Sequence, residues 1–326
     1  MKVILFGQVG QANSTCKKLE EELGMEVEIH QEPLTKENLH LVHGFDALNI
    51  DYMPMNADFL QAIKDTGVKY VSTRSVGYDL IDLDAAKRIG LKMGNSSYSP
   101  HNVAEYTVML ILMCVRNAKR HLDGYVYQDF YTPDKQGRML GNTTVGVLGT
   151  GRIGTTVIRI LHAFGCRILA YDLYPNEEVK QYAEYVALDT LLAQSDIITL
   201  HMPSTKENRH MINAESVAKM KKGALLVNTA RGALVETDTV LEGLESGQLG
   251  GAALDVLEEE VPYYKRNCAG EVIKSRSMNA LQGMPNVILT GHNAWNTVDA
   301  SDETLENSLR SCYWELTGQE NPYRLV

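Results

Sequence analysis

Three glycines lie close together in the middle of the chain, in the order Gly149, Gly151 and Gly154. They follow a short apolar run at residues 145–148 and precede residues 155–164, which have the apolar spacing of a helix. A strand, a Gly-x-Gly-x-x-Gly turn and a helix in this order bind the pyrophosphate of a dinucleotide. The first glycine permits the tight turn, the second lets the backbone approach the phosphates, and the third lets the helix pack on the strand. Free N–H groups at the start of the helix attract the phosphates.

An aspartate stands where an adenosine ribose would bind. Asp172 ends the next predicted strand, eighteen residues after Gly154, which is close to the spacing at which an acidic residue accepts hydrogen bonds from the ribose hydroxyls. Its charge would repel a 2′-phosphate, and no Arg or Lys follows within residues 173–176. The expected cofactor is therefore NAD. A flavodoxin-like turn or a chance triplet is the competing interpretation of the glycines, and the downstream carboxylate disfavours it.

Further polar residues follow other predicted strands. Arg231 comes after residues 225–227, the segment from Asp255 to Glu260 after residues 252–254, and His292 after residues 287–289. Ligands of open α/β sheets bind at the carboxyl ends of the strands, so these side chains are candidates for chemistry. A guanidinium can hold a carboxylate with two parallel hydrogen bonds, and an imidazole can exchange a proton near neutral pH.

The elements that position these residues form two series. Short strand-like runs alternate with helical segments, which indicates parallel α/β sheets. The first series has strands at residues 3–6, 27–30, 47–50 and 70–72 and helices at 12–23 and 58–65. The second has strands at residues 145–148, 168–171, 197–200, 225–228, 252–254 and 287–289. A helix after Ser99-Pro100 is expected to connect the two series, and a helix at residues 301–315 is expected to return to the first.

Composition narrows the class of protein. A chain of 326 residues is too long for one typical domain, and a net charge of −10 without a Lys/Arg cluster argues against nucleic acid as a partner. The five cysteines are scattered without a Cys-x-x-Cys pair, so we expect a reducing compartment, no disulfides and no metal site. The longest apolar run, residues 106–115, is too short to span a bilayer, and the N-terminus resembles a strand. A cytoplasmic protein without a membrane partner is expected.

The chain resembles the D-specific 2-hydroxyacid dehydrogenases, in particular the D-lactate dehydrogenases, including the vancomycin-resistance type. The likeness covers nearly the whole length. It lies in residues 70–77 (YVSTRSVG), 98–105 (YSPHNVAE), the glycine loop, His201-Met202-Pro203 and residues 250–255 (GGAALD), and in the spacing from Arg231 through Glu260 to His292.

The resemblance implies two doubly wound parallel-sheet α/β domains. A flavodoxin-like substrate domain would comprise residues 1–100 and 299–326, and a Rossmann NAD-binding domain residues 101–298. It also implies a homodimer joined through the NAD-binding domain.

Carried over by position, the resemblance implies three groups of site residues. The catalytic residues would be Arg231, Glu260 and His292. Substrate would be bound by Val76, Gly77, Tyr98, Arg231 and Trp295. The cofactor would be bound by Gly149, Gly151, Arg152, Ile153, Gly154, Asp172, Met202, Pro203, Asn208, Thr229, Ala230 and Asp255.

The implied reaction is the reduction of pyruvate to D-lactate with NADH. His292 would supply the proton, Glu260 would favour the protonated imidazole, and Arg231 would hold the carboxylate. Glu258 or Glu259 is an alternative partner of the histidine. Alternative functions are reduction of a larger 2-keto acid (phenylpyruvate, 2-ketoisocaproate or 2-oxoglutarate) and NAD(H) sensing by a corepressor-like protein.

The chain departs from the family pattern around the histidine. Gly291 replaces the usual proline before His292, which loosens the backbone that aims the ring. Trp295 and Asn296 stand where relatives often have other aromatic residues. A large indole beside the substrate predicts a preference for small keto acids.

Overall fold

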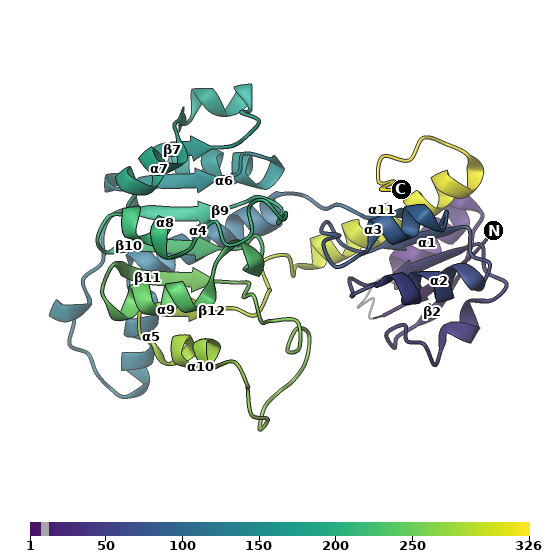
Figure 1. Cartoon of the computed structure of the whole chain (residues 1–326), viewed down its shortest axis with the longest axis horizontal. Helices are drawn as coiled ribbons and strands as arrows, with labels where there is room; N and C mark the ends of the chain where they lie inside the picture. Colours follow the sequence, from purple (N-terminus) through teal and green to yellow (C-terminus); the bar gives the residue numbers. More distant parts are fainter. Residues whose placement is uncertain (8–12) are drawn as a thin grey trace. The chain divides into compact units, whose positions relative to one another are not determined.

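A computed structural model describes residues 1–7 and 13–326 of the chain. These residues form two compact units (Figure 1). Unit 1 comprises Met1–Ser99 and Asn296–Val326, and unit 2 comprises Pro100–Trp295. The last segment of the chain thus returns to the unit that the first segment begins.

Unit 1 is built on a parallel sheet with the strand order β2-β1-β3-β4-β5 over its described residues. This is the order of flavodoxin-like folds. The strands are β1 (Lys2–Phe6), β2 (Glu26–His30), β3 (Ala47–Ile50), β4 (Tyr70–Thr73) and β5 (Lys92–Gly94). The helices are α1 (Asn13–Leu23), α2 (Ala57–Asp65), α3 (Leu83–Arg88) and α11 (Val298–Thr317).

Alternating side chains of β1 divide unit 1 into two cores. Ile4 and Phe6 point to the face covered by α2 and α3. Val3 and Leu5 point to the other face, where they pack with residues of α1 and with Leu305 and Leu309 of α11. Because successive side chains of a strand point to opposite faces, one apolar run serves both layers.

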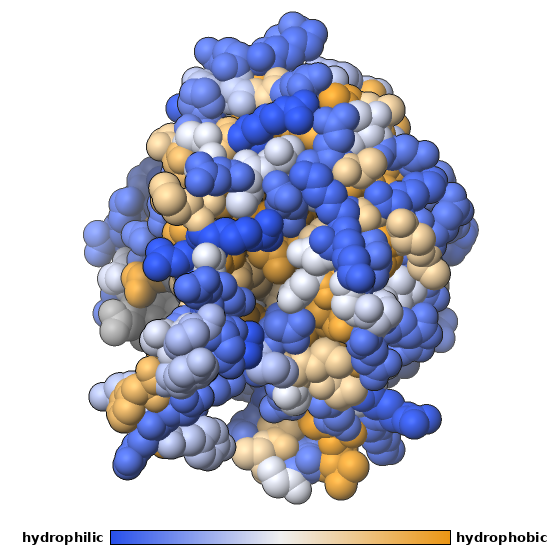
Figure 2. All heavy atoms as spheres, turned by 90° about the vertical axis from the view of Figure 1, so that its left-hand side faces the viewer, coloured by the Kyte–Doolittle hydropathy of each residue, from blue (hydrophilic) through white to orange (hydrophobic). Residues whose placement is uncertain are grey.

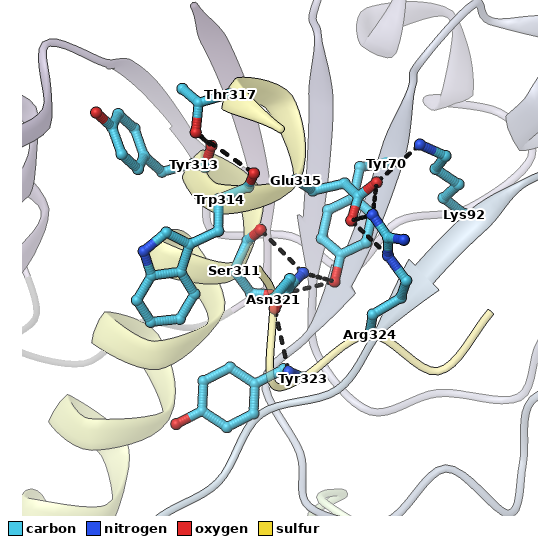
Figure 3. Close-up of polar contacts among 10 residues, drawn as sticks. All are labelled: Tyr70, Lys92, Ser311, Tyr313, Trp314, Glu315, Thr317, Asn321, Tyr323 and Arg324. Carbon is cyan, nitrogen blue, oxygen red and sulfur yellow. Dashed lines mark hydrogen bonds and ion pairs between the residues drawn. The ribbon is translucent and has the colours of Figure 1, made fainter. Parts of the chain in front are cut away.

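The end of α11 is fixed to the sheet by a polar cluster (Figure 3). The buried Glu315 carboxylate accepts hydrogen bonds from Lys92 at 2.9 Å and from Arg324 at 2.6 and 2.7 Å. Burial opposes ionisation of Glu315, but the bonds from Arg324 and Lys92 outweigh it and hold its pKa below the ordinary value. Tyr70 adds a hydrogen bond of 2.7 Å to Ser311. The chain terminus is thereby tied to β4 and β5.

Unit 2 is described without gaps and has a parallel sheet of order β12-β11-β10-β9-β6-β7-β8. The order reverses direction at β6 and β9, as in Rossmann folds. The strands are β6 (Thr144–Leu148), β7 (Arg167–Tyr171), β8 (Glu184–Tyr185), β9 (Ile197–Leu200), β10 (Ala224–Asn228), β11 (Leu249–Leu254) and β12 (Val287–Leu289). The helices are α4 (His101–Val115), α5 (Ala118–Val126), α6 (Arg152–Ala163), α7 (Leu188–Gln194), α8 (Ala214–Lys219), α9 (Thr237–Glu245) and α10 (Arg276–Gly283).

Helices cover both faces of this sheet. Residues of α4 and α6 share one apolar core, and residues of α7, α8, α9 and α10 share the other. The prediction of two doubly wound parallel sheets is confirmed. Two short strands, β5 and β8, were not predicted, and the first residue of the predicted helix at 12–23, Ala12, lies outside the described residues. Among the residues that are described, no helix has the length and apolar character needed to cross a membrane.

Candidate active site

The glycine loop joins β6 to α6, and two of its three glycines are required for steric reasons. Gly149 has φ +93°, and a Cβ there would lie 2.7 Å from the carbonyl oxygen of His201. A Cβ on Gly154 would lie 2.0 Å from the carbonyl oxygen of Gly149, whereas Gly151 faces open space. The N-cap residue of α6 is Gly151, which has no side chain to cap the first turn, and the helix starts at Arg152 and Ile153. The loop therefore fits a pyrophosphate, which needs close backbone approach and the N–H groups of a helix start.

Asp172 follows β7 and faces this loop. Its Oδ2 accepts hydrogen bonds from the N–H and hydroxyl of Thr150 at 2.6 and 3.0 Å, and its Oδ1 accepts one from the N–H of Tyr174 at 2.9 Å. The hydroxyl of Tyr185 donates to Thr150 at 2.7 Å. The carboxylate is thus held in place while its oxygens retain lone pairs for ribose hydroxyls. Sequence reasoning missed Thr150 and Tyr185, because only the folded loop brings them to Asp172.

The segment after β9 contains His201, Met202 and Pro203. The Nε2 of His201 lies 2.9 Å from the hydroxyl of Thr199, and its Nδ1 is buried without a partner in the described part of the chain. Burial lowers the pKa of His201 to about 3, so the imidazole is neutral near pH 7. Met202 packs against the core.

Asn208 closes the turn that follows. Its Oδ1 accepts from the N–H of Thr205 at 2.7 Å, and its Nδ2 donates to the carbonyl of Pro203 at 2.8 Å. Asn38 in unit 1 makes the same pair of bonds in a matching Pro-x-Thr-Lys-Glu-Asn segment, at 2.7 and 3.0 Å. The bonds of Asn208 are therefore explained by the turn itself.

Arg231 follows β10 in a turn that Asn228 organises. The side chain of Asn228 accepts from the N–H of Ala230 at 3.0 Å and donates to the carbonyl of Arg231 at 2.9 Å. Thr229 is hydrogen-bonded through its hydroxyl to Thr107 of α4 at 2.7 Å. The half-buried Arg231 side chain donates from Nη1 to the carbonyl of Ala230 at 2.7 Å. Sequence reasoning missed the organising role of Asn228, although this residue ends a predicted strand.

Asp255 ends β11 and anchors the histidine loop. Its Oδ1 accepts from the hydroxyl of Thr290 at 2.5 Å and the N–H of Asn293 at 2.8 Å, and its Oδ2 accepts from the N–H of Ala294 at 2.9 Å. The backbone carbonyl of Asp255 accepts from the N–H of His292 at 2.5 Å. The buried carboxylate thus fixes the backbone on both sides of His292.

Glu260 is the glutamate that contacts the histidine. Its Oε1 lies 2.8 Å from the Nδ1 of His292, and its Oε2 accepts from the N–H of Leu257 at 3.0 Å. Glu258 instead binds Arg209 and His210, and Glu259 accepts from the hydroxyl of Thr237 at 3.3 Å. The three adjacent glutamates therefore have three different sets of partners.

Aromatic side chains complete the surroundings of His292. The ring of Tyr264 lies 4.9 Å from the imidazole, centroid to centroid, with an interplanar angle of 38°. The Nζ of Lys265 lies 5.6 Å from the Tyr264 ring and 5.1 Å from the Trp295 ring. The indole N–H of Trp295 is buried without a hydrogen-bond partner among the described residues. Sequence reasoning missed Tyr264, for which no sequence signal was available.

Val76, Gly77 and Tyr98 belong to unit 1. Val76 and Gly77 lie in the turn after β4, where Asn95 donates to the carbonyl of Val76 at 2.8 Å and Ser75 to that of Gly77 at 2.7 Å. Tyr98 is half-buried near the end of the first segment of this unit. With its carbonyls bound in this way, the turn is held in a fixed shape.

The described residues contain no group of three or more His, Cys, Asp or Glu side chains that could hold a metal ion. All five cysteines have free thiols.

Comparison with known proteins gives consistent matches. The family model described as "D-isomer specific 2-hydroxyacid dehydrogenase, NAD binding domain" matches residues 108–294. A D-specific alpha-keto acid dehydrogenase of Enterococcus faecium is 46% identical over 79% of each chain. An aromatic 2-oxoacid reductase of Clostridium sporogenes is 38% identical over 98% of this chain and 97% of its own. The crystal structure of a D-lactate dehydrogenase from Treponema pallidum superposes with a TM-score of 0.90 at 32% identity and covers both chains completely.

Proposed function

Because the chain belongs to the D-isomer specific 2-hydroxyacid dehydrogenase family and carries its NAD-binding domain, we propose that it reduces pyruvate to D-lactate with NADH. The observation that carries this proposal is the His292–Glu260 pair, hydrogen-bonded at 2.8 Å in a loop that Asp255 anchors. An imidazole whose Nδ1 is held by a carboxylate is oriented to exchange a proton with a substrate through Nε2.

The proposed mechanism assigns one task to each side chain. When bound, NADH supplies the hydride that reduces the C2 carbonyl. Glu260 accepts a hydrogen bond from Nδ1 of His292 and orients the ring, and Nε2 donates its proton to the carbonyl oxygen while C2 receives the hydride, so that the carbonyl becomes an alcohol. Arg231 binds the substrate carboxylate with its planar guanidinium and stabilises charge on the oxygen. We further assign carboxylate binding to the N–H groups of Val76 and Gly77.

We assign the cofactor residues to unit 2. The N–H groups of the Gly149–Gly154 loop bind the pyrophosphate, and Asp172 accepts from the adenosine ribose. The segments that follow β9, β10 and β11 hold the rest of the dinucleotide. They contribute Met202, Pro203, Asn208, Thr229, Ala230 and Asp255.

Replacing Asp172 with serine tests the cofactor preference. The wild-type protein should use NADH in preference to NADPH, because the carboxylate repels a 2′-phosphate. Asp172→Ser removes this charge and should narrow the ratio of the two kcat/KM values by about tenfold, which corresponds to about 1.4 kcal/mol. Asp189→Ser is the matched control, since Asp189 is an exposed acid of α7 that pairs with Lys219. Equal kcat/KM for both cofactors in the wild type would contradict the assignment.

We assign to Trp295 the contact with the side chain of the keto acid. Indole leaves room for the methyl group of pyruvate, whereas a benzyl group requires the ring to move, and overpacking costs about 1–3 kcal/mol. We expect pyruvate to be preferred over phenylpyruvate by about tenfold or more. Trp295→Ala should shift the preference toward phenylpyruvate while lowering overall activity. NADH oxidation with each acid, for both proteins, gives the four kcat/KM values.

Reduction of an aromatic keto acid is the second candidate. It is favoured by the similarity to the aromatic 2-oxoacid reductase of Clostridium sporogenes. A wild-type preference for phenylpyruvate in the same assay would establish this candidate and refute the small-substrate proposal.

We also propose that the protein is a homodimer joined through unit 2. The segment from α5 to residue 139 exposes large apolar side chains, as expected of an association surface. They are Leu122, Tyr125, Val126, Tyr127, Phe130, Tyr131 and Met139, and the most exposed, Tyr127, is 82% accessible. Figure 2 views the side of the molecule that carries this segment and shows apolar residues open to solvent among polar ones. Sedimentation equilibrium tests the proposal, and a monomeric mass would refute it.

A further inference from the structure

More than one contact is needed to fix the orientation of the His292 imidazole ring. The backbone around it is fixed by the bonds of Asp255 to Thr290, Asn293 and Ala294. Both Gly291 and His292 have left-handed backbone conformations, with φ +64° and +57°. The backbone therefore fixes the position of the Cβ atom of His292. Rotation about the side-chain torsions can still turn the imidazole ring.

Glu260 restrains one edge of the ring. A single hydrogen bond from Nδ1 at 2.8 Å fixes the position of that atom and leaves the ring free to tilt about the bond. Proton delivery from Nε2 depends on the tilt, because donor and acceptor must align within hydrogen-bond geometry. A second contact, on the face of the ring, is required to fix its plane.

Tyr264 provides that contact. Its ring centroid lies 4.9 Å from that of the imidazole, within the range of favourable aromatic pairs. The N–H of Tyr264 donates to the carbonyl of Glu260 at 2.9 Å. The two residues that contact the imidazole, Glu260 at Nδ1 and Tyr264 at the ring, therefore belong to one turn of the backbone. The Nζ of Lys265 lies over the Tyr264 ring at 5.6 Å and over the Trp295 ring at 5.1 Å, which holds the tyrosine in turn.

We infer that Tyr264 is a positioning residue, which fixes the plane of the His292 ring by its aromatic face and thereby raises kcat. This inference rests on the proposed function of His292 and adds a residue that acts through it. The contact with His292 is made by the aromatic ring of Tyr264. Phenylalanine should therefore replace it, and an aliphatic side chain should not.

The experiment compares Tyr264→Phe, Tyr264→Leu and Tyr264→Met with the wild type. The leucine and methionine variants should lose about tenfold in kcat for pyruvate reduction while KM for NADH stays within about twofold, and the phenylalanine variant should retain wild-type values. Tyr263→Leu is the matched control, because the hydroxyl of Tyr263 accepts a bond from the N–H of Lys274 at 3.0 Å. It should leave kcat unchanged.

Proton NMR of the histidine rings supplies a readout that does not depend on turnover. The chain has nine histidines, and His292→Gln identifies the His292 resonance by its loss. The Tyr264 ring current should displace this resonance in the wild type and in Tyr264→Phe, and the displacement should vanish in the aliphatic variants.

The outcomes separate this inference from the proposed function. Wild-type turnover in a His292→Ala variant would refute the catalytic assignment itself. If His292→Ala is inactive but the aliphatic variants of Tyr264 keep both kcat and the displaced resonance, the positioning role is refuted. Equal losses in Tyr264→Phe and Tyr264→Leu, or in Tyr263→Leu and Tyr264→Leu, would also overturn it.

Discussion

His292→Ala should lower kcat for keto-acid reduction by about two to four orders of magnitude and leave NADH binding nearly unchanged. The variant removes the proton donor, whereas the glycine loop that is proposed to bind the cofactor lies on other elements of unit 2. Stopped-flow reduction of pyruvate and fluorescence titration of NADH measure the two quantities. The control is His162→Ala, since His162 is an exposed residue near the end of α6. Wild-type turnover in His292→Ala would refute the assignment of His292 as the proton donor.

Substitutions of Glu260 and of the adjacent Glu259 form a matched pair that tests which glutamate is the partner of His292. Glu260→Gln removes the charge that faces the imidazole and should lower kcat, whereas Glu259→Gln changes a residue bonded to Thr237 and should not. If both variants behave alike, the partner of His292 has been misassigned.

Arg231→Lys should lower kcat/KM for the keto acid by about ten- to a hundredfold. An ammonium cannot reproduce two parallel hydrogen bonds, and a hydrogen bond to a charged group contributes about 1.5–3 kcal/mol. Steady-state kinetics over a range of pyruvate concentrations measure the loss. Arg159→Lys is the matched control, because Arg159 is an exposed residue of α6 that pairs with Glu178 at 3.5 Å. Unchanged kcat and KM in Arg231→Lys would place the guanidinium outside the site.

Much of the fold could be predicted from local patterns. Apart from β2, whose residues are half-buried or exposed, the strands that were predicted are buried apolar runs, and such runs are recognisable in a sequence. β5 and β8 were missed because they have only three and two residues and include the charged Lys92 and Glu184. A strand this short is defined by the neighbour to which it hydrogen-bonds, and the neighbour is known only from the fold.

Spacing alone was enough to select the glycine loop and Asp172 as candidate cofactor residues. The choice among Glu258, Glu259 and Glu260 depends on a turn of backbone that directs adjacent side chains to different partners. The ring contact of Tyr264 was beyond prediction for the same reason. Asp255 was expected at the cofactor, and the hydrogen bonds of its carboxylate to the loop that carries His292 were not predicted.

The return of α11 to unit 1 determines the order in which the chain can fold on the ribosome. Unit 2 is one continuous segment, so all residues of its core are made before α11. One core of unit 1 combines Val3, Leu5 and Tyr70 with Leu305 and Leu309, and the last two are made some three hundred residues after the first. Domains generally fold from the N-terminus onward during synthesis, and unfinished cores are prone to aggregate. In this chain the unit that is begun first is completed only by α11, so one face of its sheet stays partly uncovered until that helix leaves the ribosome.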